Sequence, residues 1–157
     1  MNPDGDGGGG RVALFPDSLD VLLVEDNPGD ARLAQEAWKE GGIPGHLHLV
    51  PDGMAAIRFL RQLPPYTDAP RPHLILLDLN LPCMDGREVL ADIKKDPALL
   101  RIPVVVMTTS QAETDILRCY DLHANCYVAK PVDLDSFMSV IKSIAVFWGR
   151  VVRLPPR

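Results

Sequence analysis

The sequence predicts a doubly wound α/β domain in which five helices flank one sheet of five parallel strands. Two observations support this prediction. Five short apolar runs alternate with five segments in which apolar residues recur at helical spacing. Three of the runs also lack polar alternation, as strands covered on both faces do. Because crossovers between parallel strands are right-handed, we expect helices on both faces of the sheet.

The expected strands are short runs rich in valine, leucine and isoleucine. They cover residues 21–24, 47–50, 74–77, 104–107 and 126–129. The first, third and fourth runs are continuously apolar, which is typical of central strands in a parallel sheet.

Each expected helix has apolar residues on one face. The first follows Pro28, a residue suited to the first turn of a helix, and the second follows Asp52 and Gly53. The third ends before Pro97. The apolar positions of the five helices are, in order, Leu33, Ala34, Ala37 and Trp38; Ala56, Ile57, Leu60 and Leu63; Val89, Leu90 and Ile93; Ile116, Leu117, Tyr120 and Leu122; and Phe137, Ile141, Ile144 and Trp148.

The predicted domain organisation is simple. Residues 1–17 are rich in glycine and aspartate, and we expect a disordered leader because they offer little apolar area to bury. Residues 18–148 form the folded domain, and residues 149–157 form a C-terminal tail too short for an output module. Prolines 64, 65, 70 and 72 exclude a helix before the third strand and predict a semi-rigid surface loop.

The composition argues against several classes of protein. The chain has 16 basic and 21 acidic residues, a net charge of −5, whereas general nucleic-acid or anionic-membrane binders carry a basic surplus. No apolar run approaches the roughly 18 residues that span a bilayer, and the first residues have no apolar signal region. Cys83, Cys119 and Cys126 have no C-x-x-C spacing, which favours reduced thiols in a cytoplasmic protein.

Polar residues follow four of the expected strands. Glu25 and Asp26 follow the first strand, Asp78 the third, and Lys130 the fifth, while Thr108 follows the fourth. Because ligands of such sheets bind at the carboxyl ends of the strands, we expect these side chains to converge. Carboxylates held together repel one another unless a cation is present, and hard oxygen ligands suit Mg²⁺ or Mn²⁺.

This set of groups suits phosphoryl transfer. A divalent metal and the ammonium group of Lys130 beside Asp78 would stabilise the oxygens of a phosphoryl group. Asp78 is therefore a candidate nucleophile that forms an aspartyl phosphate. The hydroxyl of Thr108 can donate a hydrogen bond to another phosphoryl oxygen.

Four motifs in combination resemble the response-regulator receiver domains of two-component signalling. They are VLLVEDN, LILLDLNLPCMDG, PVVVMTTS and YVAKP, and the resemblance covers residues from about 19 to 148. It implies the flavodoxin-like receiver fold, with Asp78 as the phospho-acceptor. It also implies that Asp26 binds Mg²⁺ directly, that Glu25 acts through a metal-bound water, and that the backbone carbonyl of Asn80 completes the ligands.

The resemblance implies roles for four further residues. Lys130 would bridge Asp78 and the phosphoryl group, with a cis peptide bond before Pro131. Thr108 and Tyr127 match the switch pair of the family: the threonine hydroxyl moves to the phosphoryl oxygen and the aromatic ring turns inward. Gly86 is expected where the turn requires an unusual backbone angle.

The lifetime of the phosphoryl group on Asp78 cannot be predicted from the residues at two positions. Asn80 and Ser110 stand where the family varies and where the residue tunes that lifetime. Met84 and Asp85, in the same loop as Asn80, are expected to be loop scaffold rather than ligands.

Further motifs resemble the single-domain regulators that pair with phytochrome-type sensor kinases. They are EDNPGD, the proline-rich insertion, MTTS, ANCYVAKP and the aromatic end of the last helix. This resemblance implies that a sensor histidine kinase, a bacteriophytochrome, supplies the phosphoryl group. The protein would signal by binding partners and, turning over no external metabolite, would not be an enzyme.

The last expected helix is apolar over more of its surface than one core-facing stripe needs. Its apolar residues are Phe137, Val140, Ile141, Ile144, Val146, Phe147, Trp148 and Val151. A helix with an apolar tail is one interpretation. A homodimer that forms through this helix and the adjoining strand is the other, because exposed apolar patches usually mark interfaces.

Two other functions stay open. A metal-dependent phosphohydrolase can also form an aspartyl phosphate, but it usually has a second acid two residues after the nucleophile, where this chain has Asn80. A phosphorylation-independent adaptor could keep the fold, although the intact acids, Thr108 and Lys130 argue against it. His46, His48, His73 and His123 lack a zinc-like spacing, and we expect them to be strand or surface histidines.

Overall fold

The computed structural model describes residues 16–157 and has the predicted alternation of strands and helices. All but the last two residues of the expected leader therefore lie outside the described part of the chain. The elements are, in order, β1 (Leu19–Val24), α1 (Pro28–Glu40), β2 (Gly45–Val50), α2 (Gly53–Leu60), β3 (Leu74–Leu77), α3 (Gly86–Lys95), β4 (Val104–Thr108), α4 (Glu113–Asp121), β5 (Cys126–Ala129), α5 (Leu134–Val146) and the π-helical segment η1 (Phe147–Val151).

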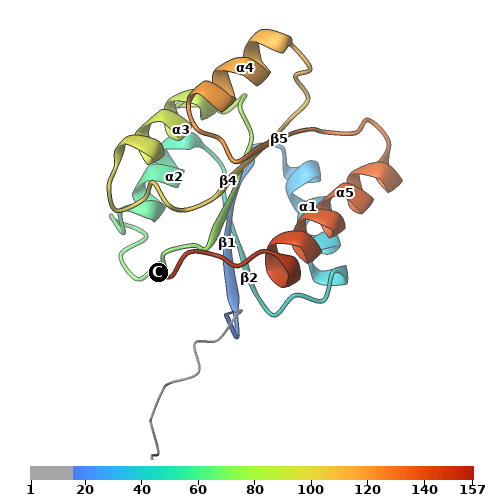
Figure 1. Cartoon of the computed structure of the whole chain (residues 1–157), viewed down its shortest axis with the longest axis horizontal. Coiled ribbons are helices and arrows are strands. Elements are labelled where there is room, and N and C mark those ends of the chain that lie inside the picture. The colour runs from blue at the N-terminus through green and yellow to red at the C-terminus, as the bar shows by residue number, and fades with distance from the viewer. Residues whose placement is uncertain (1–15) are drawn as a thin grey trace, which may run out of the picture.

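The five strands form one parallel sheet in the order β2-β1-β3-β4-β5. Strands β1, β3 and β4, which contain the continuously apolar runs, are its three central strands, and every residue in them is buried. Helices α1 and α5 cover one face, and helices α2, α3 and α4 lie on the other (Figure 1). The predicted fold class is confirmed.

Each face of the sheet has its own apolar core, because successive side chains of a strand point to opposite faces. Leu22, Val24, Ile75 and Leu77 pack with the residues of α2 and α3. The intervening residues of β1 and β3 pack with α1 and α5. The apolar runs within β1, β3 and β4 therefore have no polar alternation, as the sequence pattern indicates.

Side-chain caps define where four of the helices begin. Asn27, Asp52, Asp85 and Asp133 each accept a hydrogen bond from a backbone N–H in the first turn, at 2.8 to 3.0 Å. Two of these caps stand directly beyond the carboxyl ends of β1 and β2. The local sequence thus determines where the chain turns from β1 and β2 into the following helices, at the edge of the sheet where ligands are expected.

The helices differ from the sequence pattern at three places. Helix α2 ends at Leu60, and Leu63 beyond it is exposed in the proline-rich segment, which contains no helix. Helix α4 buries only Cys119, whereas Leu117 and Tyr120 are exposed. Helix α5 continues into η1, which runs past the expected boundary at residue 148.

The C-terminal segment returns to the amino-terminal edge of the sheet (Figure 1). There the guanidinium of Arg157 donates a hydrogen bond to Asp20 Oδ2 at 3.1 Å, and Leu154 packs against the apolar core beneath α5.

Within residues 16–157, no helix combines the length and the apolar character that a bilayer crossing requires.

Candidate functional site

The predicted site residues come together at the carboxyl-terminal edge of the sheet. Asp78 is attached to β1 by its backbone N–H, which donates to the carbonyl of Val24 at 3.1 Å. The backbone N–H of Lys130 donates to the carbonyl of Thr108 at 2.7 Å, which holds the ends of β4 and β5 together. The sheet's own hydrogen bonds therefore position the predicted nucleophile, hydroxyl and ammonium group.

Lys130 is the cationic centre of the site. Its Nζ lies 2.6 Å from Glu25 Oε2, 3.0 Å from Asp78 Oδ2 and 3.2 Å from Asp30 Oδ2, and its side chain is only 6% exposed. Burial opposes the charged ammonium, but the hydrogen bond to Glu25 and the charge of Asp78 outweigh it and raise the pKa of Lys130. The side chain therefore carries a positive charge at neutral pH.

The acidic groups outnumber this cation. Carboxylate oxygens of Glu25, Asp26 and Asp78 lie within 4.8 Å of one another, with Glu25 and Asp78 buried and Asp26 exposed. Burial raises the pKa of Glu25 by more than its contacts with Lys130 lower it. A divalent cation would compensate this charge. The oxygen-only donor set, open to water at Asp26, fits Mg²⁺ or Mn²⁺.

Asp30 belongs to the site, and sequence reasoning missed it. It lies in the first turn of α1, four residues after Asp26, where the cap at Asn27 turns the chain into the helix. Its distance of 3.2 Å to Lys130 Nζ makes it the third carboxylate around that ammonium group. The motif EDNPGD contains Asp30, and its place in the first helical turn directly after the first strand was the signal that could have found it.

Asn80 lies in the loop after β3, and Gly86 is the first residue of α3, where that loop ends. The backbone N–H of Asn80 lies 3.4 Å from Asp78 Oδ1, and the metal-binding role of its carbonyl stays a prediction. The prediction of an unusual backbone angle at Gly86 is wrong, because in the described chain the glycines with positive φ are Gly42 and Gly45. Gly86 is needed for close approach instead: a Cβ there would lie 2.2 Å from the carbonyl oxygen of Asp78.

The cis peptide bond predicted before Pro131 is also wrong. Within the described residues the cis peptide bond joins Pro64 and Pro65, so the Lys130–Pro131 bond is trans. The trans form is lower in energy for most X–Pro bonds by about 0.5–1 kcal/mol. Lys130 reaches Glu25 and Asp78 from this trans arrangement.

Thr108 and Tyr127 are linked through Ser110. Thr108 is fully buried, and its hydroxyl oxygen lies 3.4 Å from the backbone N–H of Ser110. The Tyr127 hydroxyl donates to the carbonyl of Ser110 at 2.8 Å. Burial raises the pKa of Tyr127, so the phenol keeps the proton that it donates.

A charged network continues from Ser110 to helix α3. The Ser110 hydroxyl donates to Asp115 Oδ2 at 2.6 Å, and Arg87 Nη2 donates to Asp115 Oδ1 at 2.6 Å. We call Arg87, Ser110, Asp115 and Tyr127 the α4 network. Sequence reasoning gave Arg87 and Asp115 no role, because these residues are 28 positions apart and no local pattern pairs them.

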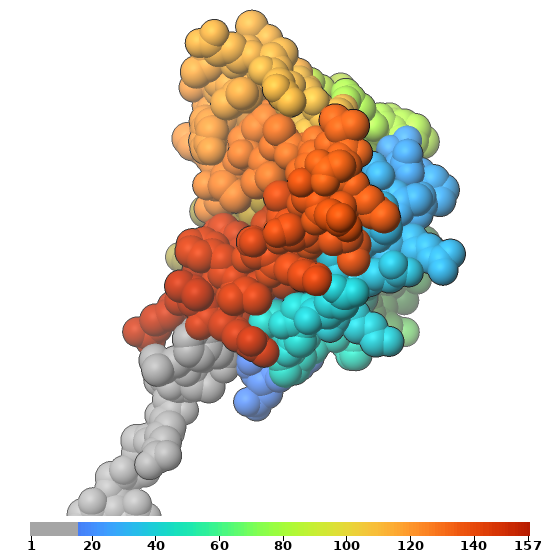
Figure 2. All heavy atoms as spheres, turned by 90° about the vertical axis from the view of Figure 1, so that its right-hand side faces the viewer, coloured from blue at the N-terminus to red at the C-terminus, as the bar shows by residue number. Residues whose placement is uncertain are grey.

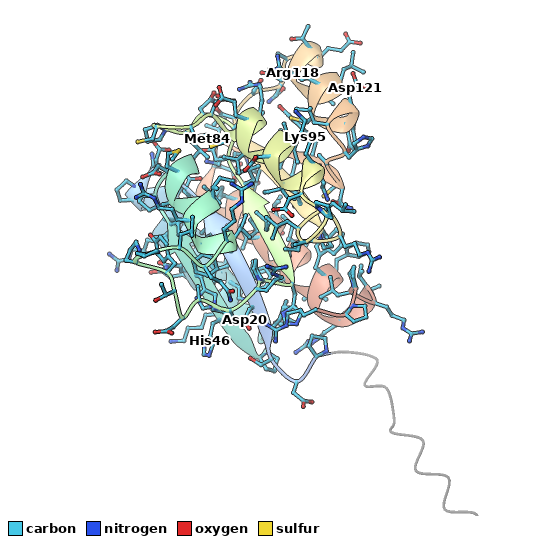
Figure 3. The ribbon with its side chains drawn as sticks, turned by 90° about the vertical axis from the view of Figure 1, so that its left-hand side faces the viewer. Asp20, His46, Met84, Lys95, Arg118 and Asp121 are labelled. Carbon is cyan, nitrogen blue, oxygen red and sulfur yellow. The ribbon has the colours of Figure 1, made fainter. Side chains whose placement is uncertain are left out.

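The histidines and Cys83 lie outside the acidic cluster. His48 Nε2 is 2.9 Å from Asp20 Oδ1, and His73 Nδ1 accepts the backbone N–H of Asp20 at 3.0 Å. Asp20 and His46 stand at the end of the sheet opposite to Met84, which belongs to the loop after β3 (Figure 3). Cys83 is exposed, with a φ of 68°.

Comparison with known proteins shows the family of the chain. The family model for the response regulator receiver domain matches residues 21–142. Response regulator Rcp1 of Synechocystis sp. is 51% identical over 135 residues, which cover 86% of this chain and 92% of Rcp1.

Two solved structures extend the similarity to the whole fold. The Mn²⁺-bound form of response regulator Rcp1 has a TM-score of 0.85 and 50% identity, and covers 88% of this chain and 99% of its own. The phosphorylated cyanobacterial phytochrome response regulator RcpA has a TM-score of 0.86 and 51% identity, with the same coverage. The motifs at the strand ends, the sheet order and these similarities have one explanation, which is that the chain belongs to the response regulator receiver domain family.

Proposed function

We propose that this response regulator accepts a phosphoryl group from a phosphohistidine of a sensor histidine kinase onto Asp78. The observation that carries the proposal is the position of Asp78. Its Oδ2 lies 3.0 Å from the buried ammonium group of Lys130, and its carboxylate stands within 4.8 Å of those of Glu25 and Asp26. A nucleophile, a fixed cation and a metal-binding acid pair thus share one edge of the sheet.

The chain's own residues account for the chemistry. A carboxylate oxygen of Asp78 attacks the phosphorus, an O–P bond forms, and the P–N bond to the kinase imidazole breaks with its electron pair remaining on nitrogen. Lys130 stabilises the phosphoryl oxygens by its charge, and the Thr108 hydroxyl offers a further hydrogen bond.

The metal has a defined set of residues to hold it. Glu25, Asp26, Asp78 and the backbone carbonyl of Asn80 would bind Mg²⁺ or Mn²⁺. When bound, the ion neutralises negative charge that builds up on the transferring phosphoryl group. The Mn²⁺-bound form of Rcp1, at 50% identity, supports this assignment.

The kinase partner is of the phytochrome type. RcpA, described as a phytochrome response regulator in phosphorylated form, is 51% identical to this chain, and the bacteriophytochrome response regulator AtBRR is 38% identical. We infer a cytoplasmic protein that signals through protein partners and binds neither nucleic acid nor membranes, consistent with its net charge of −5.

Thr108 and Tyr127 form the switch in this proposal. Phosphorylation draws the Thr108 hydroxyl towards a phosphoryl oxygen, and Ser110 follows because its backbone N–H lies next to that hydroxyl. The carbonyl of Ser110 holds the Tyr127 hydroxyl, so the ring responds to the same movement. The switch therefore acts on α4 and β5, the elements that the α4 network joins.

A second copy of the chain is the partner for the last helix. Val146, Phe147 and Val151 are exposed, and a cavity of about 500 Å³ lies between β5 and α5. Figure 2 shows α5 and η1 running across the middle of this face beside the segment that contains β5. Because β5 is the last strand of the sheet and its outer edge has no neighbouring strand in the described chain, the same face could pair with itself about a two-fold axis.

Labelling with acetyl phosphate and Mg²⁺ tests the phospho-acceptor. We expect stable labelling of up to one phosphoryl group per chain, lost in Asp78→Asn and in Asp26→Ala, because these remove the nucleophile and a metal ligand. Asp121→Asn is the matched control, since this exposed aspartate stands on α4 away from the site (Figure 3).

The same assay separates the two alternatives. A metal-dependent phosphohydrolase would turn over a phosphomonoester many times, and an adaptor would not be labelled at all. Labelling that survives in Asp78→Asn would contradict the assignment of the nucleophile. Timed transfer from a phosphorylated phytochrome kinase then tests the partner.

A further inference from the structure

A cavity lies at the edge of the sheet opposite to Asp78. It has a volume of about 170 Å³ and is bounded by the segments that precede β3 and β4 and by the C-terminal segment. Figure 1 shows that the C-terminus returns to this edge. The cavity shares no lining residue with the acidic site and has no part in the proposed phosphoryl transfer.

The polar groups that line this cavity are basic, so they favour an anionic ligand. Arg71, Arg101, Arg157 and His73 line it, and no aspartate or glutamate among the described residues does. This is unusual in a chain with a net charge of −5. Asp20 compensates part of the charge, since its Oδ2 lies 3.1 Å from Arg157 Nη1, but it is shared with His48. The other two guanidinium groups have no carboxylate partner in the described chain.

His73 adds a hydrogen-bond donor to the lining of the cavity. Its side chain belongs to a residue only 8% exposed, and its Nδ1 accepts the backbone N–H of Asp20 at 3.0 Å. In the neutral imidazole the proton must then be on Nε2, which makes no hydrogen bond within residues 16–157. Burial and the nearby charge of Arg157 lower the pKa of His73 and favour this neutral form. Within residues 16–157 the buried polar side-chain atom without a partner is Trp38 Nε1, so the His73 Nε2–H group is not sealed off and an anion in the cavity can accept from it.

The remaining walls are apolar and stiff. Five prolines line the cavity, two of them in the C-terminal segment. Proline has a fixed backbone angle, so such walls are largely preformed. The volume is close to that of protein cavities of about 150 Å³ that take up benzene.

We propose that this cavity binds a small organic oxyanion, a carboxylate or phosphate group on an apolar body about the size of a benzene ring. The guanidinium groups of Arg71 and Arg101 would meet the oxygens, since planar guanidinium groups match oxyanions. The Nε2–H of His73 would donate to the same group, and the prolines would enclose the apolar body.

The test is a titration of the full chain with benzoate, phenyl phosphate and inorganic phosphate. Calorimetry measures the binding, and NMR measures the signal of His73 Nε2 during the titration. We expect saturable binding of an aryl anion, a shift of the Nε2 signal, and weaker binding of inorganic phosphate. Comparison of benzoate with phenyl phosphate identifies which oxyanion the site prefers.

Arg101→Gln is the informative variant, because Arg101 is exposed and makes no hydrogen bond or ion pair in the described chain. We expect about tenfold weaker binding in this variant, the loss of one charge-assisted hydrogen bond. Arg153→Gln removes the same charge from the same end of the molecule but outside the cavity, and should bind as the wild type does.

Four results would overturn the proposal. Three of them are no saturable binding by either aryl anion, equal weakening in Arg153→Gln, and binding that disappears in Asp78→Asn. The last result would put the anion at the acidic site. Tighter binding of inorganic phosphate than of both aryl anions would also exclude an organic ligand. None of these results affects the labelling of Asp78, so the two proposals fail independently.

Discussion

Gly86 shows at the scale of one residue how backbone contact constrains the site. Its Cα faces the carbonyl of Asp78, and a Cβ would lie 2.2 Å from that oxygen and 2.6 Å from the Cα of Leu79. Both are backbone atoms of the segment that carries the nucleophile, so no side-chain rotation can relieve the clash. The close packing of this loop against α3 therefore depends on glycine.

We expect Gly86→Ala to lower the free energy of unfolding by about 2–4 kcal/mol, because the segment around Asp78 must shift. Labelling of Asp78 should slow at the same time, since its carboxylate moves relative to Lys130. Urea unfolding and the labelling assay measure the two effects. Gly29→Ala is the control: its Cβ would meet only a side-chain oxygen of Asn27, at 3.2 Å. Equal stability of the two variants would contradict the expectation.

Among the five α-helices, α4 buries the fewest residues. It buries only Cys119, and its N-cap residue Ala112 provides no side-chain hydrogen bond. Polar contacts hold it instead: Asp115 binds Arg87 and Ser110, and the Tyr120 hydroxyl accepts the backbone N–H of Tyr127 at 3.2 Å. An element held in this way can occupy a second position at modest cost, which suits the output of a switch.

We expect Arg87→Gln to raise amide hydrogen exchange in α4 about three- to tenfold, because it removes the link from Asp115 to α3. Exchange in α1 and α5 should not change, since neither helix contacts the α4 network. Arg118→Gln is the matched control, because Arg118 lies on α4 itself, is exposed and makes no side-chain hydrogen bond in the described chain. Equal exchange in both variants would mean that the network does not position α4.

At the scale of the whole molecule, three exposed apolar side chains, Val146, Phe147 and Val151, lie close in sequence at the end of α5 and in η1. Phe147 is 49% exposed and Val151 61% exposed at the end of α5, next to the open edge of β5. Other exposed apolar residues, such as Leu117 on α4, stand elsewhere on the surface. The concentration of exposed apolar side chains after α5 is the reason to expect self-association there.

Light scattering at about 10 μM should give the mass of a dimer for the wild type and of a monomer for Phe147→Asp, because a charge cannot be buried unpaired in an apolar interface. Leu117→Asp should remain dimeric, since it adds the same charge to a different helix. Labelling of Asp78 in Phe147→Asp confirms that the fold is intact. A monomeric wild type, or a dimeric Phe147→Asp, would end the dimer proposal.

Most of the acidic site could be predicted without coordinates. Apolar runs identify buried strands, and every parallel strand brings its carboxyl end to the same edge, so Asp78 and Lys130 are expected at one edge of the sheet. Their direct contact also depends on the strand order, which places only β4 between β3 and β5. Glu25, Asp26 and Thr108 follow by the same rule. These are consequences of backbone direction and need no knowledge of side-chain packing.

Only the tertiary structure decided which side chains from distant segments touch. Arg87 and Asp115 are 28 positions apart, and Arg157 lies 137 positions from Asp20. No local sequence pattern therefore indicates either contact. The need for glycine at position 86 and the exposure of α4 also depend on how loops and helices pack. Local sequence sets strands, caps and the direction of the chain, whereas long-range side-chain contacts arise only once the two cores have formed.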